Sequence, residues 1–141
     1  MKLDRATIER LVPQTGTMCL LDAVSQWNAG SIVCTADAPG SDHPLARDEH
    51  VPAIASCEYA AQAAAIHGAL IEHALAPRAG MLAKLMDIEL HAPGFPAGEP
   101  VRVRAEMLSR VAAGCLYSFQ VSAGESPVCD GRLMVVFGAP A

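Results

Sequence analysis

The stretch VPAIASCEYAAQAAA, residues 51–65, constrains the fold more than any other part of the chain. Pro52 suits the first turn of a helix, where its missing N–H donor costs nothing, and Pro77 and Gly80 mark an end. We predict one long helix from about Pro52 to Leu75, roughly 35 Å at 1.5 Å per residue. Small side chains would let a strongly curved sheet approach this helix closely, and the alanines available are Ala53, Ala60, Ala61, Ala63, Ala64, Ala65 and Ala69.

The remaining segments have the patterns of β-strands. MCLLDAVSQW and SIVCTAD flank the turn NAG at 28–30, which predicts a hairpin. Four more such segments follow the helix: GMLAKLMDIELHA, EPVRVRAEMLSRV, GCLYSFQVSAG and PVCDGRLMVVFG. Apolar and charged residues alternate in VRVRAEM, which is typical of a sheet with one face in water. We expect an α+β fold of about six antiparallel strands in a single domain, residues 1–141, after a short helix at 4–10 capped by Asp4.

Composition and charge exclude several classes of function. The net charge is −5 and no basic cluster occurs, so we expect no nucleic-acid partner. No apolar stretch reaches the roughly 18 residues of a membrane span, and the N-terminus has no hydrophobic signal core. The 5 cysteines contain no CxxC spacing, which indicates reduced thiols in the cytoplasm rather than a metal site. Because 52% of the residues are hydrophobic, we expect part of the surface to be buried in an oligomer.

One acid and one amide interrupt the alanine helix. Glu58 and Gln62 are four residues apart and therefore share a face. The loop at 38–52 adds His43 and His50 just before the helix. Imidazole transfers protons near neutral pH, a carboxylic acid in an apolar site can donate one, and unsatisfied N–H groups around 53–55 can hold an oxyanion. The set predicts acid–base chemistry at the helix start.

Each of these residues also has a structural interpretation. Glu58 could cap the helix start or pair with Arg47, and Gln62 could bridge helix and sheet. The two histidines lie in a polar loop, where imidazoles are commonly solvated. Cys57 near a helix start could be a nucleophile, but small buried cysteines are far commoner. No HExxH, GxSxG or phosphate-binding glycine motif supports a zinc protease, serine hydrolase or P-loop enzyme.

Three stretches carry a resemblance to a known family: LVPQTGTMCLLDAV at 11–24, DHPLARDEHVPAIASCEYAAQAAA at 42–65 and GMLAKLMDIELHAPGFPAGEPVRV at 80–103. They resemble the hotdog-fold 3-hydroxyacyl-(acyl-carrier-protein) dehydratases, and most of all a divergent branch found with aryl-polyene-type lipid synthesis clusters. The E-x-x-A-Q spacing after an HP loop is the most specific part. The chain departs from the family where Gln14 replaces a histidine, Thr17 a proline and Ala53 a glycine.

The resemblance implies a set of roles. The catalytic histidine falls on His43 and the catalytic carboxylate on Glu58, with Gln62 supporting the site. Backbone N–H groups at the helix start, Ala53 and Ile54, would face the thioester carbonyl. The family fold is a curved sheet wrapped around the long helix, and its histidine and carboxylate meet across a dimer interface. The resemblance implies no cofactor and no metal.

The implied reaction is dehydration of a 3-hydroxyacyl thioester, carried on acyl carrier protein or coenzyme A, to the trans-2-enoyl thioester. His43 would take the C2 proton and Glu58 would give a proton to the departing hydroxyl. A hotdog thioesterase and a non-catalytic subunit, which binds acyl chains or completes a heterodimer, remain alternatives because function depends on the site and not on the fold. A homodimer is expected, and a heterodimer or a higher oligomer stays open.

Overall fold

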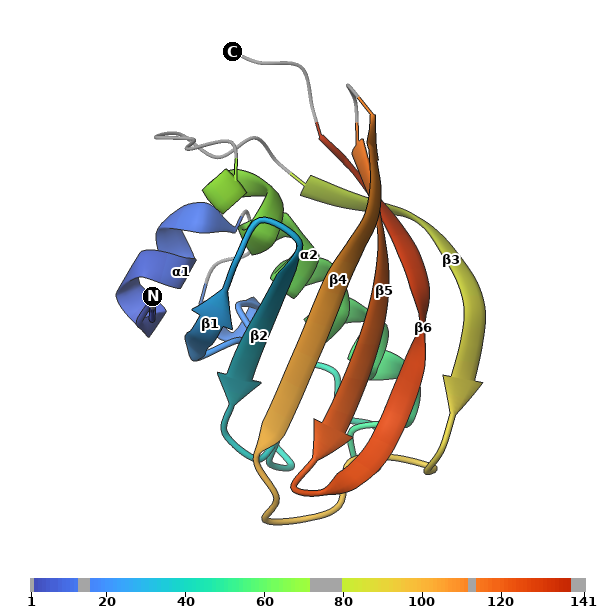
Figure 1. Ribbon diagram of the computed structural model, residues 1–141. Coiled ribbons are helices and arrows are strands. Elements are labelled where there is room, and N and C mark those ends of the chain that lie inside the picture. The colour runs from blue at the N-terminus through green and yellow to red at the C-terminus, as the bar shows by residue number, and fades with distance from the viewer. Residues whose placement is uncertain (1, 13–15, 72–79, 112–113, 138–141) are drawn as a thin grey trace.

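The computed structural model describes residues 2–12, 16–71, 80–111 and 114–137, which form one curved antiparallel sheet around a helix (Figure 1). The strands are β1 (Ala23–Trp27), β2 (Ser31–Ala36), β3 (Gly80–Leu90), β4 (Val101–Val111), β5 (Gly114–Ala123) and β6 (Ser126–Phe137). The helices are α1 (Arg5–Leu11) and α2 (Ser56–Ile71), with 3-10 turns at Gly16–Met18 and Ala53–Ala55. The 6 strands pair in the order β1-β2-β4-β5-β6-β3, which confirms the predicted sheet.

The central helix α2 is enclosed on all sides. Every residue from Ser56 to Ala69 is buried except Glu58. A helix that is apolar around its whole circumference is stable only inside a core, and alanine lets the surrounding strands approach without loss of side-chain entropy. The predicted start near Pro52 is confirmed, since Pro52 is the N-cap of the turn that leads into α2. The predicted end near Leu75 lies outside the described residues.

The alternation along β4 sorts its side chains between two environments. Val101, Val103 and Ala105 are buried on the helix side of the sheet, while Arg102 and Arg104 are exposed on the other side. The predicted wet face is therefore confirmed. The short N-terminal helix is confirmed as well, because the Asp4 carboxylate accepts the Thr7 N–H at 3.0 Å.

The start of α2 is attached to the loop that follows β3. The Ala53 N–H donates to the Pro93 carbonyl at 3.1 Å, and the Phe95 N–H donates to the Val51 carbonyl at 3.0 Å. Between these bonds lies Gly94, where an added Cβ would come within 2.7 Å of the Val51 oxygen. The close approach therefore requires glycine.

A buried histidine in the second half of α2 connects the helix to β5 and to the turn between β1 and β2. His67 is 0% exposed, and its Nε2 lies 2.8 Å from the Asn28 carbonyl while its Nδ1 lies 2.8 Å from the Tyr117 hydroxyl. Since a carbonyl can only accept, Nε2 carries the proton and the Tyr117 hydroxyl donates to Nδ1. Burial lowers the pKa of His67 below its ordinary value of 6.5, so the imidazole is neutral.

This neutral imidazole makes the fold sensitive to acid. Because the pKa of His67 is lower in the folded than in the unfolded chain, the free energy of unfolding decreases as the pH falls below about 6.5 and levels off below the folded-state pKa. Urea unfolding at several pH values measures this slope. The His67→Gln variant loses this part of the slope, whereas His43, whose pKa burial also lowers, contributes equally to both proteins. Identical slopes in the two proteins would contradict the assignment.

Candidate functional site

Glu58 is the one partly exposed residue in the buried run of α2, and Gln62 lies beneath it one turn later. The Gln62 side chain is 1% exposed, and its Nε2 donates to Glu58 Oε1 at 3.1 Å. The predicted pairing of these two side chains on one helix face is present in the structure. The Glu58 carboxylate is thus partly exposed to solvent, and it has the Gln62 amide as a hydrogen-bond partner.

The orientation of the Gln62 amide is fixed by two backbone groups. Gln62 Oε1 accepts the Leu20 N–H at 2.9 Å, and Nε2 donates to the Met18 carbonyl at 2.8 Å. Since an N–H only donates and a carbonyl only accepts, the amide cannot be reversed. Its second N–H is then directed at Glu58. Gln62 thus ties the segment before β1 to α2 and holds the carboxylate at the same time.

His43 is half-buried in the loop between β2 and the helix start. Its Nδ1 accepts the Leu45 N–H at 3.0 Å, and its Nε2 lies 3.1 Å from the Tyr59 hydroxyl oxygen. Burial lowers the pKa of His43, and the nearby Asp42 carboxylate opposes this shift. The imidazole is therefore held as a neutral group by its own loop and by α2.

Tyr59 is a site residue that sequence reasoning missed. It is 1% exposed, and its ring stacks on that of His43 with the two ring centroids 5.9 Å apart. Its ring centroid also lies 5.4 Å from that of Phe95. Burial raises the pKa of the phenol to about 12, so Tyr59 stays neutral. The available signal was its place directly after Glu58, as the only aromatic residue in the alanine segment.

The expected free N–H groups at the helix start are mostly occupied, which corrects the sequence prediction. The Ala53 N–H is bonded to Pro93, and the Ala55 N–H donates to the Pro52 carbonyl at 3.0 Å. The post-β3 loop and the 3-10 turn thus use donors that a regular α-helix would leave open. Ile54, which is 50% exposed, is the remaining residue of this turn.

Two hollows adjoin these residues. An open pocket of about 370 Å³ is lined by His43 and Tyr59 together with Arg5, Thr17 and Cys19. A more apolar groove of about 690 Å³ lies between the 92–96 loop and residues 126–128, next to the helix start. All 5 cysteines are buried and none forms a disulfide, and burial raises the pKa of Cys57, so the structure favours its packing role over a nucleophilic one.

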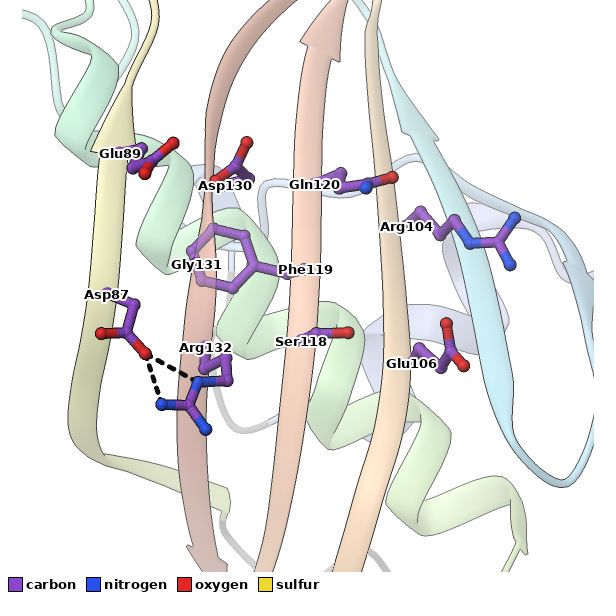
Figure 2. Close-up of a pocket in the computed structure, with 10 residues that line it drawn as sticks. All are labelled: Asp87, Glu89, Arg104, Glu106, Ser118, Phe119, Gln120, Asp130, Gly131 and Arg132. Atoms are coloured by element: carbon purple, nitrogen blue, oxygen red, sulfur yellow. Dashed lines mark hydrogen bonds and ion pairs between the residues drawn. The ribbon is translucent and has the colours of Figure 1, made fainter.

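A third hollow lies on the outer face of the sheet, away from α2 (Figure 2). Its volume is about 460 Å³, and charges of both signs line it, including the ion pair of Arg132 with Asp87 and the side chains of Arg104 and Glu106. None of the residues predicted to be catalytic reaches this face. We interpret it as the solvated side of the sheet.

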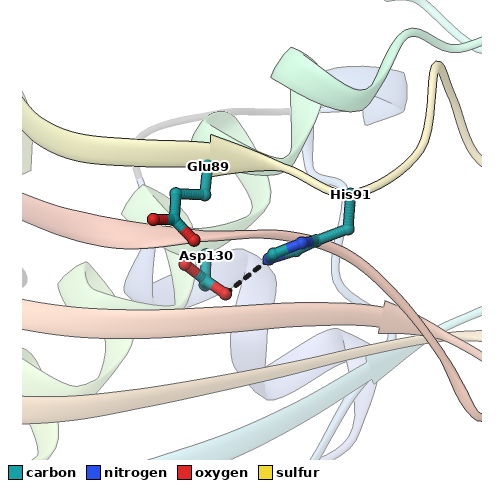
Figure 3. Close-up of side chains that lie close together, drawn as sticks. All are labelled: Glu89, His91 and Asp130. Atoms are coloured by element: carbon teal, nitrogen blue, oxygen red, sulfur yellow. Dashed lines mark hydrogen bonds and ion pairs between the residues drawn. The ribbon is translucent and has the colours of Figure 1, made fainter.

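Glu89, His91 and Asp130 form a cluster where the end of β3 lies beside the first part of β6, with ligand atoms within 4.8 Å of one another (Figure 3). Such a set could hold a divalent cation, and it was missed because only the β3–β6 register brings Glu89 opposite Asp130. His91 Nε2 already pairs with Asp130 at 2.7 Å, and the cluster is largely exposed. We assign it no role in the candidate site.

The Gln62 network predicts a measurable loss of stability on truncation. In Gln62→Ala the buried Leu20 N–H loses its acceptor, and an unpaired buried donor costs about 1–3 kcal/mol. Urea unfolding should therefore show a decrease in unfolding free energy of at least this size. The matched variant Gln120→Ala, on the exposed sheet face, should change it by less than about 0.5 kcal/mol. Equal effects would refute a structural role for the Gln62 amide.

Comparison with known proteins relates this geometry to solved structures. A chain of "The Dehydratase Heterocomplex ApeI:P from Xenorhabdus doucetiae" is 22% identical, with a TM-score of 0.81, covering 94% of this chain and 91% of that one. Zebra fish thioesterase superfamily member 2 is 12% identical, with a TM-score of 0.69 and 95% of each chain covered. A hypothetical thioesterase with coenzyme A from Streptococcus pneumoniae TIGR4 is 11% identical, with a TM-score of 0.63 over 82% of this chain and 84% of that one.

These likenesses confirm the predicted hotdog fold, and the fold is shared by dehydratases and thioesterases. No curated protein matches the sequence. The family model named ApeP-like, with the description ApeP dehydratase, matches residues 6–139, which is nearly the whole chain. This chain therefore belongs to the ApeP-like dehydratase family.

Proposed function

We propose that this chain eliminates water from a 3-hydroxyacyl thioester, carried on acyl carrier protein, to give the trans-2-enoyl thioester. The observation that carries the proposal is the placement of one carboxylate, Glu58, at the one partly exposed position between Ser56 and Ala69 of α2, held there by Gln62. Membership of a dehydratase family supports the reaction type. The neutral His43 in the preceding loop supplies a base.

The proposed step moves two protons. Neutral His43 takes the C2 proton, whose acidity the thioester carbonyl raises, and the C–H electron pair forms the C2–C3 double bond. The C3–O bond breaks, and the hydroxyl leaves as water with a proton from Glu58. The pair ends as imidazolium and carboxylate, and return of a proton from the first to the second resets it. An N–H such as that of Ile54 would stabilise the enolate-like oxygen, an effect worth about 3 kcal/mol per donor in measured oxyanion holes.

We further propose that the chain works as an oligomer in which His43 of one subunit serves Glu58 of another. β3 is an edge strand of the sheet, and it carries Leu85 at 38% and Leu90 at 53% exposure. An edge with exposed leucines is suited to pairing with a second chain. The ApeI:P structure is described as a heterocomplex, which supports a partner that is either a second copy or a related dehydratase chain.

Two further features bear on the setting. None of the helices in the described ranges has the length and hydropathy that a bilayer span requires. None of the 5 cysteines forms a disulfide, which is in keeping with the proposed cytoplasmic location, where acyl carrier proteins would be encountered as soluble partners.

The second candidate is a thioesterase, which the similarity to solved thioesterases favours. In that reaction Glu58 would activate water against the thioester carbonyl, and His43 would have no C2 proton to remove. Incubation with a 3-hydroxyacyl carrier protein, followed by mass spectrometry, separates the two. Loss of water supports the dehydratase, whereas release of free acid supports the thioesterase and contradicts our first proposal.

Removal of either proposed catalytic group should abolish most of the dehydration. We expect His43→Ala and Glu58→Gln each to lower kcat by about 10²–10⁴, the usual contribution of a positioned acid or base. His50→Ala, in the same loop but exposed, and Glu106→Gln, on the outer sheet face, are matched controls that should retain the wild-type rate. A wild-type rate in His43→Ala or Glu58→Gln would remove that residue from the mechanism.

A mixture of the two inactive variants tests the shared site. If His43 and Glu58 act across an interface, subunits of His43→Ala and Glu58→Gln that exchange will form one intact site, and part of the activity will return. The measurement is the dehydration rate after mixing, with each variant alone as control. If a related chain is the natural partner, each variant is mixed with that partner and the dehydration rate is measured in the same way. A fully active monomer would contradict the shared site.

A further inference from the structure

We infer that Arg5, in the short helix α1, is a positioning residue for the Glu58 carboxylate. Arg5 holds the segment 16–22, which lies directly before β1, and this segment in turn holds the Gln62 amide that donates to Glu58. The role rests on the proposed dehydration, in which Glu58 is the acid. Arg5 itself takes no part in the proton transfers.

One guanidinium group contacts both ends of the segment 16–22. At the first end, Arg5 Nη2 donates to the Gly16 carbonyl at 3.2 Å. At the other end, Nη1 donates to Asp22 Oδ1 at 2.7 Å and lies 3.4 Å from the Leu21 carbonyl oxygen. Arginine suits this task because its N–H donors form a rigid planar group that can serve several acceptors at once. The side chain therefore fixes the segment relative to α1.

The middle of the same segment holds the Gln62 amide. The Met18 carbonyl accepts the Nε2–H of Gln62, and the Leu20 N–H donates to its Oε1. The amide has one possible orientation, and its second Nε2–H is directed at Glu58. A shift of the segment would therefore displace the amide and remove the partner that holds the carboxylate.

Both partners of the Arg5–Asp22 ion pair are fixed by further contacts. Asp22 Oδ2 accepts the Asp37 N–H at 2.8 Å, and Arg5 Nε donates to Glu9 Oε1 at 2.9 Å, one turn later in α1. The helix itself is anchored in the core by Ile8, which is fully buried. An isolated ion pair at the surface would contribute little, but this pair connects a packed helix to the segment that holds the amide.

Arg5 also lines the open pocket that contains His43, which allows a second interpretation. A cation in that pocket could contact a phosphate group of the substrate carrier. The contacts favour the positioning role, because Nε, Nη1 and Nη2 of Arg5 all donate to acceptors of the protein. The two roles also differ kinetically: a substrate contact would change KM, whereas positioning of Glu58 would change kcat.

The first test measures the segment directly and requires no turnover. Amide hydrogen exchange of the full-length protein, followed by NMR, reports on the Leu20 N–H. The variant is Arg5→Gln, which removes the charge and keeps a good helix former. We expect the exchange of Leu20 to become about 10-fold faster relative to that of Val121, which lies in β5 between two paired strands. An unchanged Leu20 rate, or equal acceleration at Val121, would overturn the inference.

Arg10→Gln is the matched control. It makes the same substitution, with the same change in charge, in the last turn of the same helix. The Arg10 side chain donates to the Thr7 hydroxyl at 3.4 Å, within α1. The exchange rate of Leu20 and kcat should therefore remain at the wild-type values. Equal effects of Arg5→Gln and Arg10→Gln would indicate a general effect of charge and would contradict a specific role of Arg5.

The second test is kinetic. In Arg5→Gln we expect kcat for dehydration to be about 10-fold lower and KM to stay within about twofold, because the substrate still binds but the acid is misplaced. A kcat equal to that of the wild type would reject the positioning role. If KM alone increased, Arg5 would be assigned to substrate binding instead.

A double-mutant cycle tests whether the effect passes through Gln62. If Arg5 acts through this amide, adding Arg5→Gln to Gln62→Ala will lower kcat no further than Gln62→Ala alone, since the connection to Glu58 is already lost. Losses that multiply in the double variant would show that the two residues act independently and would refute the inference.

Failure of this inference can be distinguished from failure of the proposed function. If the wild type dehydrates no 3-hydroxyacyl thioester, the proposed function is wrong. The exchange rate of the Leu20 N–H in Arg5→Gln still decides whether Arg5 holds the segment 16–22, since that measurement uses no substrate.

Discussion

The enclosure of α2 by the sheet is the constraint on which the rest of the structure depends. A helix buried over its whole circumference can hold a polar side chain only where a specific partner compensates for the lost water. Gln62 meets this requirement with three hydrogen bonds, two to backbone groups of Met18 and Leu20 and one to Glu58. The same amide therefore stabilises the core and holds the carboxylate at the one partly exposed position between Ser56 and Ala69.

Local features of the fold were predictable from the sequence, whereas contacts between distant segments were not. The alanine helix, the alternation in β4 and the Asp4 cap depend on neighbouring residues, and each appears where it was expected. The occupation of the Ala53 N–H depends on Pro93, which is 40 positions away, so no local pattern announced it. For the same reason the sequence indicated an acid–base pair at His43 and Glu58 but not the phenol that holds the histidine.

Because dehydratases and thioesterases share this fold, the histidine says more than the carboxylate about which of the two reactions the site suits. A carboxylate at the start of a buried helix suits both reactions, since it can protonate a leaving group or activate water. A neutral imidazole can remove the C2 proton in an elimination, a task that thioester hydrolysis does not have. The support of His43 by Leu45 and Tyr59 is therefore in keeping with the proposed elimination.

The loop that carries His43 is itself held in place by local contacts. Arg47 and His50 pair their backbones across a tight turn, in which Asp48 and Glu49 have φ values of 50° and 67°. Non-glycine residues adopt such angles at an energetic cost, which is tolerated where the surrounding contacts determine the conformation. His43 is thus fixed within one chain by this turn and Tyr59, and Glu58 is fixed by Gln62. If the two act across an interface, association has only to bring together two halves that are already ordered, which reduces the entropy cost of forming the site.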